Sequence, residues 1–145
     1  MSFQYGEYIY VAGGLTGDPV NNPPSRKDII RSKVGADGSL GEWEPAGVIP
    51  KGLAVSAAQV FARRVFFFGG LTTSGDYVSA IQSAAFSPDG LLGETKALPV
   101  KLSVGRGHVH QTPMFGRFIY SVAGKHGIGE DDSTGAIDIG SFSAP

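Results

Sequence analysis

Short apolar runs alternate along this chain with glycine-rich and polar segments. The clearest runs are Tyr8–Ala12, Arg64–Phe68 and Phe118–Val122, and each is followed by glycine within two residues. Aromatic and β-branched residues in such runs, closed by glycine, predict β-strands. No segment of about eleven residues repeats its apolar positions with the period of a helix. The pattern therefore predicts an all-β protein with about ten strands and negligible helix.

The three runs are copies within an internal repeat. Their closing glycines are Gly14, Gly70 and Gly124, which lie 56 and 54 residues apart. The segment Ser56–Gly70 aligns without gaps on His110–Gly124, and ADGSLGEW in the first copy aligns on PDGLLGET in the second. A repeat of about fifty residues in a glycine-rich β-protein is typical of stacked four-stranded units.

We predict one domain with three such units, at about residues 1–50, 51–105 and 106–145. We label the strands of a unit a to d in chain order, so that strand b is the run that ends at glycine. The first unit has at most a remnant of strand a in Met1–Tyr5, and the last unit lacks strand d. The other predicted strands are Asp28–Val34, Gly41–Pro45, Leu53–Ala62, Val78–Ser87, Gly93–Lys96, Gly107–Phe115 and Ala136–Phe142.

The composition agrees with short strands and tight turns, because 22 of the 145 residues are glycine and 9 are proline. The net charge is −1, so the chain lacks the basic surface that binds nucleic acid or an anionic membrane. The absence of cysteine excludes disulfides and thiol chemistry. The start MSFQYGEYIY is no signal peptide, and no apolar stretch is long enough to span a membrane. The sequence predicts a protein of the cytoplasm or of a virus particle.

The units share one order of motifs: an apolar strand with a double glycine, a polar loop, a strand, a DGxxGxW segment, a loop with proline, and a further strand. This order resembles the kelch repeat, closest to the kelch-like arrays of bacteriophage tail or virion proteins and bacterial surface proteins. Trp43 fits the kelch aromatic position, which Thr95 takes in the second unit, and Ala123 replaces the first glycine of the last pair. The resemblance implies β-propeller blades, an architecture that mostly serves as a binding platform and in a minority of cases as an enzyme.

The resemblance also bears on assembly, because three blades do not close a ring. Each blade buries its faces on its neighbours, so the end blades would expose apolar surface. Kelch propellers have about six or seven blades, so two copies joined head to tail would complete a ring of about six. We expect a homodimer of this kind, with the alternative that the chain is part of a larger propeller.

The strand order places the b–c and d–a loops on one rim of the units and the tight a–b and c–d turns on the other. Binding residues are expected on long, varied loops that a rigid scaffold holds in place. The expected ligand is a glycan or a protein. The candidate contacts on the loop rim are Asp18, Asn22, Arg26, Asp76, Tyr77, Arg106, His126 and Asp131.

Two further candidates, His108 and His110, form a His-x-His pair on the predicted strand a of the third unit. Strand spacing puts both side chains on one face, near a propeller channel. They are candidate metal ligands or contacts for a polar sugar, and His126 is the one other histidine. The acidic run Glu130–Asp132 is a candidate Ca²⁺ site without the spacing of a calcium loop. Hydrogen-bonded histidines and a solvated acidic loop explain the same residues, so we expect no cofactor.

Two classes of function remain. The first is a structural or adhesive binding module without catalysis, from a phage or a cell surface. The second is an enzyme in the propeller channel, of the sugar epimerase, glycosidase or metal-dependent type. The sequence has no Walker loop, nucleophile elbow or HExxH motif, and no catalytic group recurs between units, which favours the first class. Tyr10, Phe66 and Tyr120 share one position of strand b and, like Trp43, are predicted to pack in the core.

Overall fold

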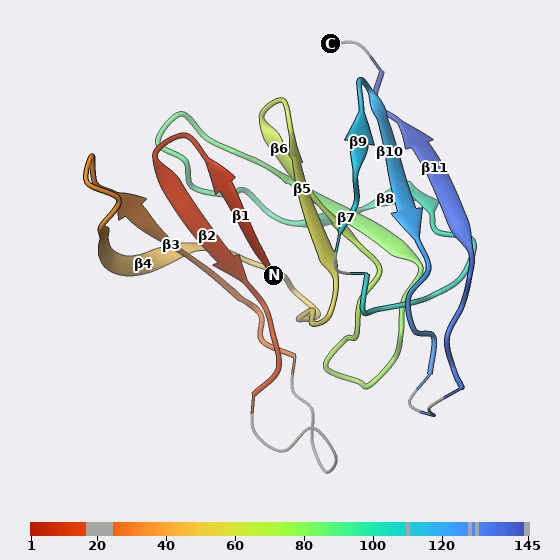
Figure 1. Ribbon diagram of the computed structural model, residues 1–145. Helices are drawn as coiled ribbons and strands as arrows, with labels where there is room; N and C mark the ends of the chain where they lie inside the picture. Colours follow the sequence, from red (N-terminus) through yellow and green to blue (C-terminus); the bar gives the residue numbers. More distant parts are fainter. Residues whose placement is uncertain (17–24, 110, 128, 130, 144–145) are drawn as a thin grey trace.

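The computed structural model describes residues 1–16, 25–109, 111–127, 129 and 131–143. These residues form eleven β-strands, which confirms the predicted all-β class. No helix long and apolar enough to cross a membrane occurs among them. The strands form three antiparallel sheets of four, four and three strands. In Figure 1 the first sheet lies at the left and the third at the right, with strands β5 and β6 between them.

Each sheet is a meander in which strands that are adjacent in sequence pair with one another. The first sheet contains β1 (Ser2–Tyr5), β2 (Tyr8–Ala12), β3 (Asp28–Val34) and β4 (Leu40–Val48). The second contains β5 (Ala57–Phe61), β6 (Arg64–Phe68), β7 (Ala80–Ala85) and β8 (Lys96–Lys101). The third contains β9 (Met114–Phe115), β10 (Phe118–Val122) and β11 (Ile137–Ser141).

The strands that glycine closes form where the apolar runs predict them, and β2, β3, β6 and β10 have the predicted bounds. Side chains along β6 alternate between two faces, and both faces are buried. Val65 and Phe67 pack with residues of the first sheet, whereas Phe66 and Phe68 pack with residues of the third. The uninterrupted apolar run of β6 therefore reflects a strand that is covered on both sides.

The prediction that the first unit has at most a remnant of strand a in Met1–Tyr5 is wrong, because β1 is a regular strand at that place. It pairs with β2 over four residues, ending with Tyr5 opposite Tyr8. Phe3 and Tyr5 are half-buried and alternate with two exposed polar residues, the pattern of a strand with one covered face. The first sheet therefore has all four strands, and among the described residues only the third sheet has three.

The outer strand of the second sheet lies later in the chain than the sequence predicts. The prediction is Gly93–Lys96, but β8 begins at Lys96 and continues through Pro99. Pro45 likewise lies inside β4. Both strands are sheet edges, where the missing N–H of proline costs no ladder hydrogen bond. Pro99 is therefore a misleading loop signal, whereas the predicted strand Gly41–Pro45 already contained Pro45.

The predicted strand Gly107–Phe115 is also wrong for most of its length, because only Met114–Phe115 pairs with β10. His108 has a φ of 53°, in the left-handed region, so the backbone turns there instead of running extended. Pro113 has no N–H to give to a neighbouring strand. His108 therefore does not stand on a strand, and His110 lies outside the described residues.

The core consists of two layers of side chains, one in each gap between sheets. In the first gap Phe86 stacks on Tyr5, with ring centroids 3.8 Å apart. In the second gap Phe142 stacks on Phe61 at 4.2 Å. Phe86 directly follows β7 and Phe142 directly follows β11, which hold the same place in their sheets. The same aromatic contact therefore recurs in both gaps.

Four aromatic residues were predicted to pack in the core, and the structure buries two of them. Tyr10 and Phe66 are buried. Tyr120 is half-buried, on the outer face of the third sheet. The prediction that Trp43 packs in the core is wrong, because this side chain is 44% exposed. It lies opposite Ser32 on β4, on the outer face of the first sheet, which no described strand covers.

The double glycine joins each sheet to the loop that precedes the next sheet. The N–H of Gly14 donates to the carbonyl of Leu53 at 2.9 Å, and the N–H of Gly70 donates to the carbonyl of Arg106 at 2.7 Å. The residue before each is also glycine, with φ of 57° and 60°. A Cβ on either would overlap the same carbonyl oxygen. Both glycines of the pair are therefore needed where one sheet meets the next.

Candidate ligand-binding rim

The long loops gather at one end of the three sheets and the tight turns at the other. The β1–β2, β5–β6 and β9–β10 turns lie at the top of Figure 1, whereas the loops that follow β2, β6 and β10 lie at the bottom. The connections from one sheet to the next, residues 49–56 and 102–113, reach the same lower end. The structure thus has the two kinds of rim that the strand order predicts.

Backbone hydrogen bonds join the rim loops into one band. Ala54 and Leu71 exchange two such bonds, each 2.8 Å long, and Gly107 and Lys125 exchange two of the same length. The N–H of His108 also donates to the carbonyl of Val55 at 2.6 Å. Each connection between sheets is therefore bound to the loop that follows strand b of its own unit. The rim side chains consequently project from a fixed scaffold.

We name Tyr77, His108 and Asp132, side chains from three different loops of this rim, the rim cluster. The rings of Tyr77 and His108 have centroids 6.4 Å apart. Gly107 makes room for the tyrosine, since a Cβ there would come within 2.7 Å of the ring. Burial raises the pKa of Tyr77, and the negative charge of Asp132 raises it further. The phenol is therefore protonated at neutral pH and can donate a hydrogen bond.

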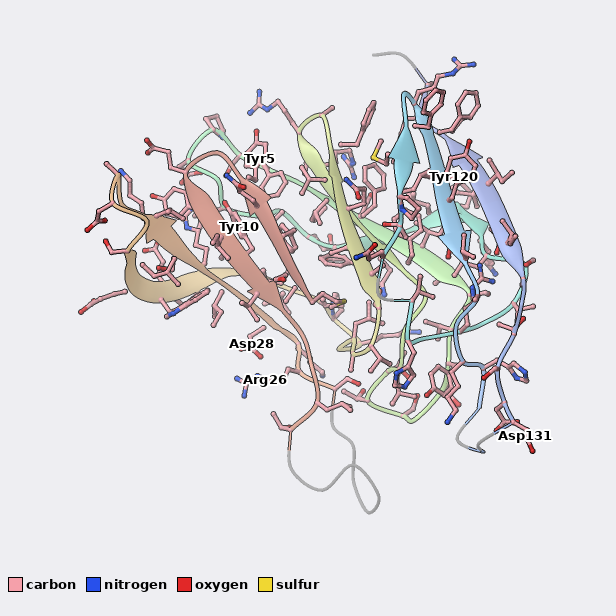
Figure 2. All side chains as sticks on the ribbon, in the orientation of Figure 1. Tyr5, Tyr10, Arg26, Asp28, Tyr120 and Asp131 are labelled. Carbon is pink, nitrogen blue, oxygen red and sulfur yellow. The ribbon has the colours of Figure 1, made fainter. Side chains whose placement is uncertain are left out.

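The loop between β10 and β11 folds around Asp132. The carboxylate of Asp132 accepts a hydrogen bond from the N–H of Gly129 at 2.6 Å, and the backbone carbonyl of Asp132 accepts one from the N–H of His126 at 2.8 Å. A side chain on Gly127 or Gly129 would collide with this carboxylate. Asp131, the residue predicted from the sequence, is exposed at the loop tip, as Figure 2 shows. The glycines at 127 and 129 are the sequence signal that could have identified Asp132.

Two other candidate residues lie on the rim with local partners. Arg26 forms a two-pronged ion pair with Asp28, with nitrogen–oxygen distances of 2.8 and 2.9 Å, and both side chains point outward in Figure 2. The hydrogen bond from Arg26 lowers the pKa of Asp28. The carboxylate of Asp76 accepts a hydrogen bond from the hydroxyl of Ser74 at 2.6 Å. Of the remaining candidates, His126 is exposed, and Asp18, Asn22 and His110 lie outside the described residues.

Arg106 belongs to the loop between the second and third sheets, but the structure places its side chain in the interior. The side chain is fully buried, and its Nη2 donates to the carbonyl of Ser121 at 3.1 Å and to the carboxylate of Asp138 at 2.7 Å. A ligand on the rim surface would not reach this guanidinium. The sequence offers no local signal for the pairing, because its two partners stand on strands of the third sheet.

The predicted metal sites do not assemble among the residues that the structure describes. No group of three or more His, Asp or Glu side chains is arranged there to hold a metal ion. The expected shared face of His108 and His110 depended on a strand that does not form, and His110 lies outside the described residues. Glu130, one residue of the predicted calcium site, lies outside them as well.

Comparison with known proteins does not assign the chain to a family. No protein-family model matches the chain, and no curated protein matches it.

Proposed function

We propose that this chain is a non-catalytic binding module, that its three sheets are consecutive β-propeller blades, and that its loop rim recognises a glycan. Recurrence supports the blade arrangement, since the aromatic stack and the glycine–carbonyl hydrogen bond occur in both gaps between sheets. The resemblance of the repeat to kelch-like arrays supports a role as a structural or adhesion component of a phage particle or a cell surface.

The rim cluster is the observation that carries the proposal. A sugar has one apolar ring face and several hydroxyl groups, so its site combines an aromatic surface with a few placed polar groups. Tyr77 offers a half-buried ring with a phenol at its edge, and the ring of His108 lies beside it. Asp132 adds a carboxylate whose charge acts on the phenol. The three side chains come from three loops that the backbone band holds together.

The phenol of Tyr77 and the carboxylate of Asp132 support recognition of a hydroxylated ligand. The phenol is protonated at neutral pH, as an ordinary tyrosine is, and its raised pKa keeps it a hydrogen-bond donor. The carboxylate of Asp132 accepts a hydrogen bond from the N–H of Gly129 and can accept others. The two groups therefore offer a ligand hydroxyl one donor and one acceptor.

A glycan array tests the proposal. The purified chain should retain one class of glycan and leave it chemically unchanged. Tyr77→Ala and His108→Ala should weaken binding at least about tenfold, which is about 1.4 kcal/mol. Glu7→Ala, an exposed change on the opposite rim, should bind like the unmodified chain. An array without a bound glycan, or equal binding by Tyr77→Ala, would overturn the glycan assignment, and turnover of the glycan would overturn the non-catalytic one.

Two uncovered apolar faces support assembly into a homodimer. The third sheet exposes five large apolar residues on its outer face, the face directed away from the second sheet. The residues that hold the same places in the second sheet face the third sheet. The outer face of the first sheet carries Ile9, Val11 and Trp43. In the second sheet, Val65 and Phe67 of β6 hold the places of Ile9 and Val11, and they are buried against the first sheet. We infer that the outer face of the third sheet packs on the first sheet of a second copy. The five residues are Phe115, Phe118, Val122, Ile137 and Ile139.

A further inference from the structure

The rim contains two junctions with the same backbone design. At the first junction the connection 49–56 lies against the loop that follows β2, and at the second junction the connection 102–113 lies against the loop that follows β6. The N–H of Leu53 donates to the carbonyl of Arg26 at 3.1 Å, and the N–H of Arg106 donates to the carbonyl of Val78 at 3.3 Å. These equivalent hydrogen bonds identify the residues that hold the same place in the two junctions.

The junctions differ at two neighbouring places. The residues before the two carbonyl acceptors are Ser25 and Tyr77, and the residues after the two N–H donors are Ala54 and Gly107. A Cβ on Gly107 would come within 2.7 Å of the ring of Tyr77 and within 2.8 Å of a methyl group of Val55. Alanine therefore stands where its neighbour is serine, and glycine stands where its neighbour is tyrosine, because the ring and the Cβ would occupy the same space.

The ring of Tyr77 explains the glycine at position 107. Gly107 is not one of the glycines with a positive φ, so alanine could adopt the same backbone conformation. Tyr77 is half-buried, and part of its ring therefore remains accessible on the rim, beside the exposed His108. An accessible aromatic surface next to polar groups is the arrangement that suits a sugar ring.

The described residues of the first junction offer no such aromatic surface. Ser25 is buried, and its hydroxyl donates to the carbonyl of Leu71 at 2.7 Å. Ala54 is fully buried, and Val55 takes the place that His108 has in the second junction. The first junction is therefore closed by its own side chains.

The charges around the second junction are mainly negative. The described residues of the loops 69–79 and 123–136 include three carboxylates and one lysine, which are Asp76, Asp131, Asp132 and Lys125. The connection 102–113 contributes one arginine, Arg106, whose guanidinium is buried and paired with a carboxylate. The charge of Asp132 acts on the phenol of Tyr77. A ligand carboxylate beside this ring would therefore meet a like charge.

We propose that the second junction is a sugar subsite that takes an uncharged sugar ring against Tyr77 and rejects sugars that carry a carboxylate. The subsite rests on the proposed glycan-binding function and adds the class of sugar. Gly107 is its positioning residue, because it leaves the space for the ring. Asp132 is the residue that selects against acidic sugars.

Paired glycans test the selection by charge. In each pair one sugar is a hexose in one member and the matching hexuronic acid in the other, and the unmodified chain should bind the neutral member at least about tenfold more tightly. Asp132→Asn keeps an acceptor for the N–H of Gly129 but removes the charge, so it should reduce this preference at least about threefold. Asp131→Asn, at the exposed loop tip, is the matched control and should keep the preference.

The possible results separate the subsite from the proposed function. Equal or tighter binding of the acidic members, or an unchanged preference in Asp132→Asn, would overturn the selection and leave glycan binding in place. An array that retains neither member of any pair would overturn the proposed function and the subsite with it.

Matched changes at the two junctions locate the sugar. Gly107→Ala should weaken binding of the neutral glycan at least about tenfold, because the added Cβ would displace the ring of Tyr77. Ala54→Gly, the reverse change at the first junction, should bind like the unmodified chain. Neither position has a positive φ, so both variants should fold, which circular dichroism verifies. Full binding by Gly107→Ala, or equal loss in both variants, would overturn the placement of the sugar at the second junction.

Discussion

Arg106 is fully buried between the second and third sheets, and its Nη2 lies 2.7 Å from the Oδ2 of Asp138. The same nitrogen donates to the carbonyl and the hydroxyl of Ser121, each at 3.1 Å. The carboxylate of Asp138 also accepts hydrogen bonds from the N–H and the hydroxyl of Ser103, at 3.0 and 3.1 Å. Asp138 therefore ties β11 to the loop that enters the third sheet.

Asp138→Asn should lower the free energy of unfolding by about 3–5 kcal/mol, because Arg106 would keep a buried charge without its partner. Arg106→Met should cost less, since Asp138 is 24% exposed and keeps its hydrogen bonds from Ser103. The double variant should be more stable than Asp138→Asn alone. Urea unfolding followed by circular dichroism measures all three, and additive losses in the double variant would contradict the coupling.

Acid should weaken the fold through the same carboxylate. Burial by itself would raise the pKa of Asp138, but the hydrogen bonds from Arg106 and Ser103 and the charge of Arg106 outweigh it, so the pKa lies below its ordinary value. Such a carboxyl stabilises the folded state fully above its unfolded pKa of about 3.9, and this contribution is lost as the pH falls through the folded pKa. The free energy of unfolding should therefore fall more steeply below about pH 4 in the unmodified chain than in Asp138→Asn. Parallel pH profiles would be evidence against this role.

Truncation of the second core layer should be costly. Phe66→Ala, Phe68→Ala and Ile119→Ala should each lower the free energy of unfolding by about 2–5 kcal/mol, because these buried side chains would leave cavities. Asp131→Ala is the control and should change it by less than about 0.5 kcal/mol, since the side chain is exposed at a loop tip. Denaturant titration compares the four variants, and losses below about 1 kcal/mol at all three core positions would show that β6 and β10 are not central.

Gly69→Ala should destabilise the chain more than Gly6→Ala. Both glycines have a positive φ, 60° and 58°, so both substitutions carry backbone strain of about 1–2 kcal/mol. A Cβ on Gly69 would also overlap the carbonyl of Arg106, whereas nothing lies within 4 Å of one on Gly6. Thermal unfolding should therefore show a larger drop in Tm for Gly69→Ala. Equal drops would mean that strain alone accounts for the glycine pair.

The mass in solution tests the proposed homodimer. Light scattering should give twice the chain mass of 15.1 kDa. Ile139→Lys should give a monomer, because this residue is 66% exposed on the outer face of the third sheet and would bring a charge into the interface. Leu91→Lys, on an exposed turn away from that face, should remain dimeric. A stable monomer of the unmodified chain at micromolar concentration would rule the homodimer out.

The sequence by itself determined the strands that end at glycine and the three repeating units. A run such as Arg64–Phe68 specifies its own conformation, because β-propensity and the positive φ of the following glycine act within a few residues. The same local signals placed Tyr77 on a connecting loop, but they placed His108 on a strand that the structure does not form there. Local signals failed at the edge strand β8, where Pro99 is tolerated because no neighbour needs its N–H.

Only the tertiary structure decided which candidate side chains share a site. Arg26 and Arg106 are both basic residues on rim loops, yet one is exposed beside Asp28 and the other is buried against a residue 32 positions away. Likewise Asp132 joins the rim cluster and its neighbour Asp131 does not, because the loop folds around one carboxylate. Burial and the choice of partner depend on contacts between segments that are distant in sequence, and the local pattern of residues does not specify those contacts.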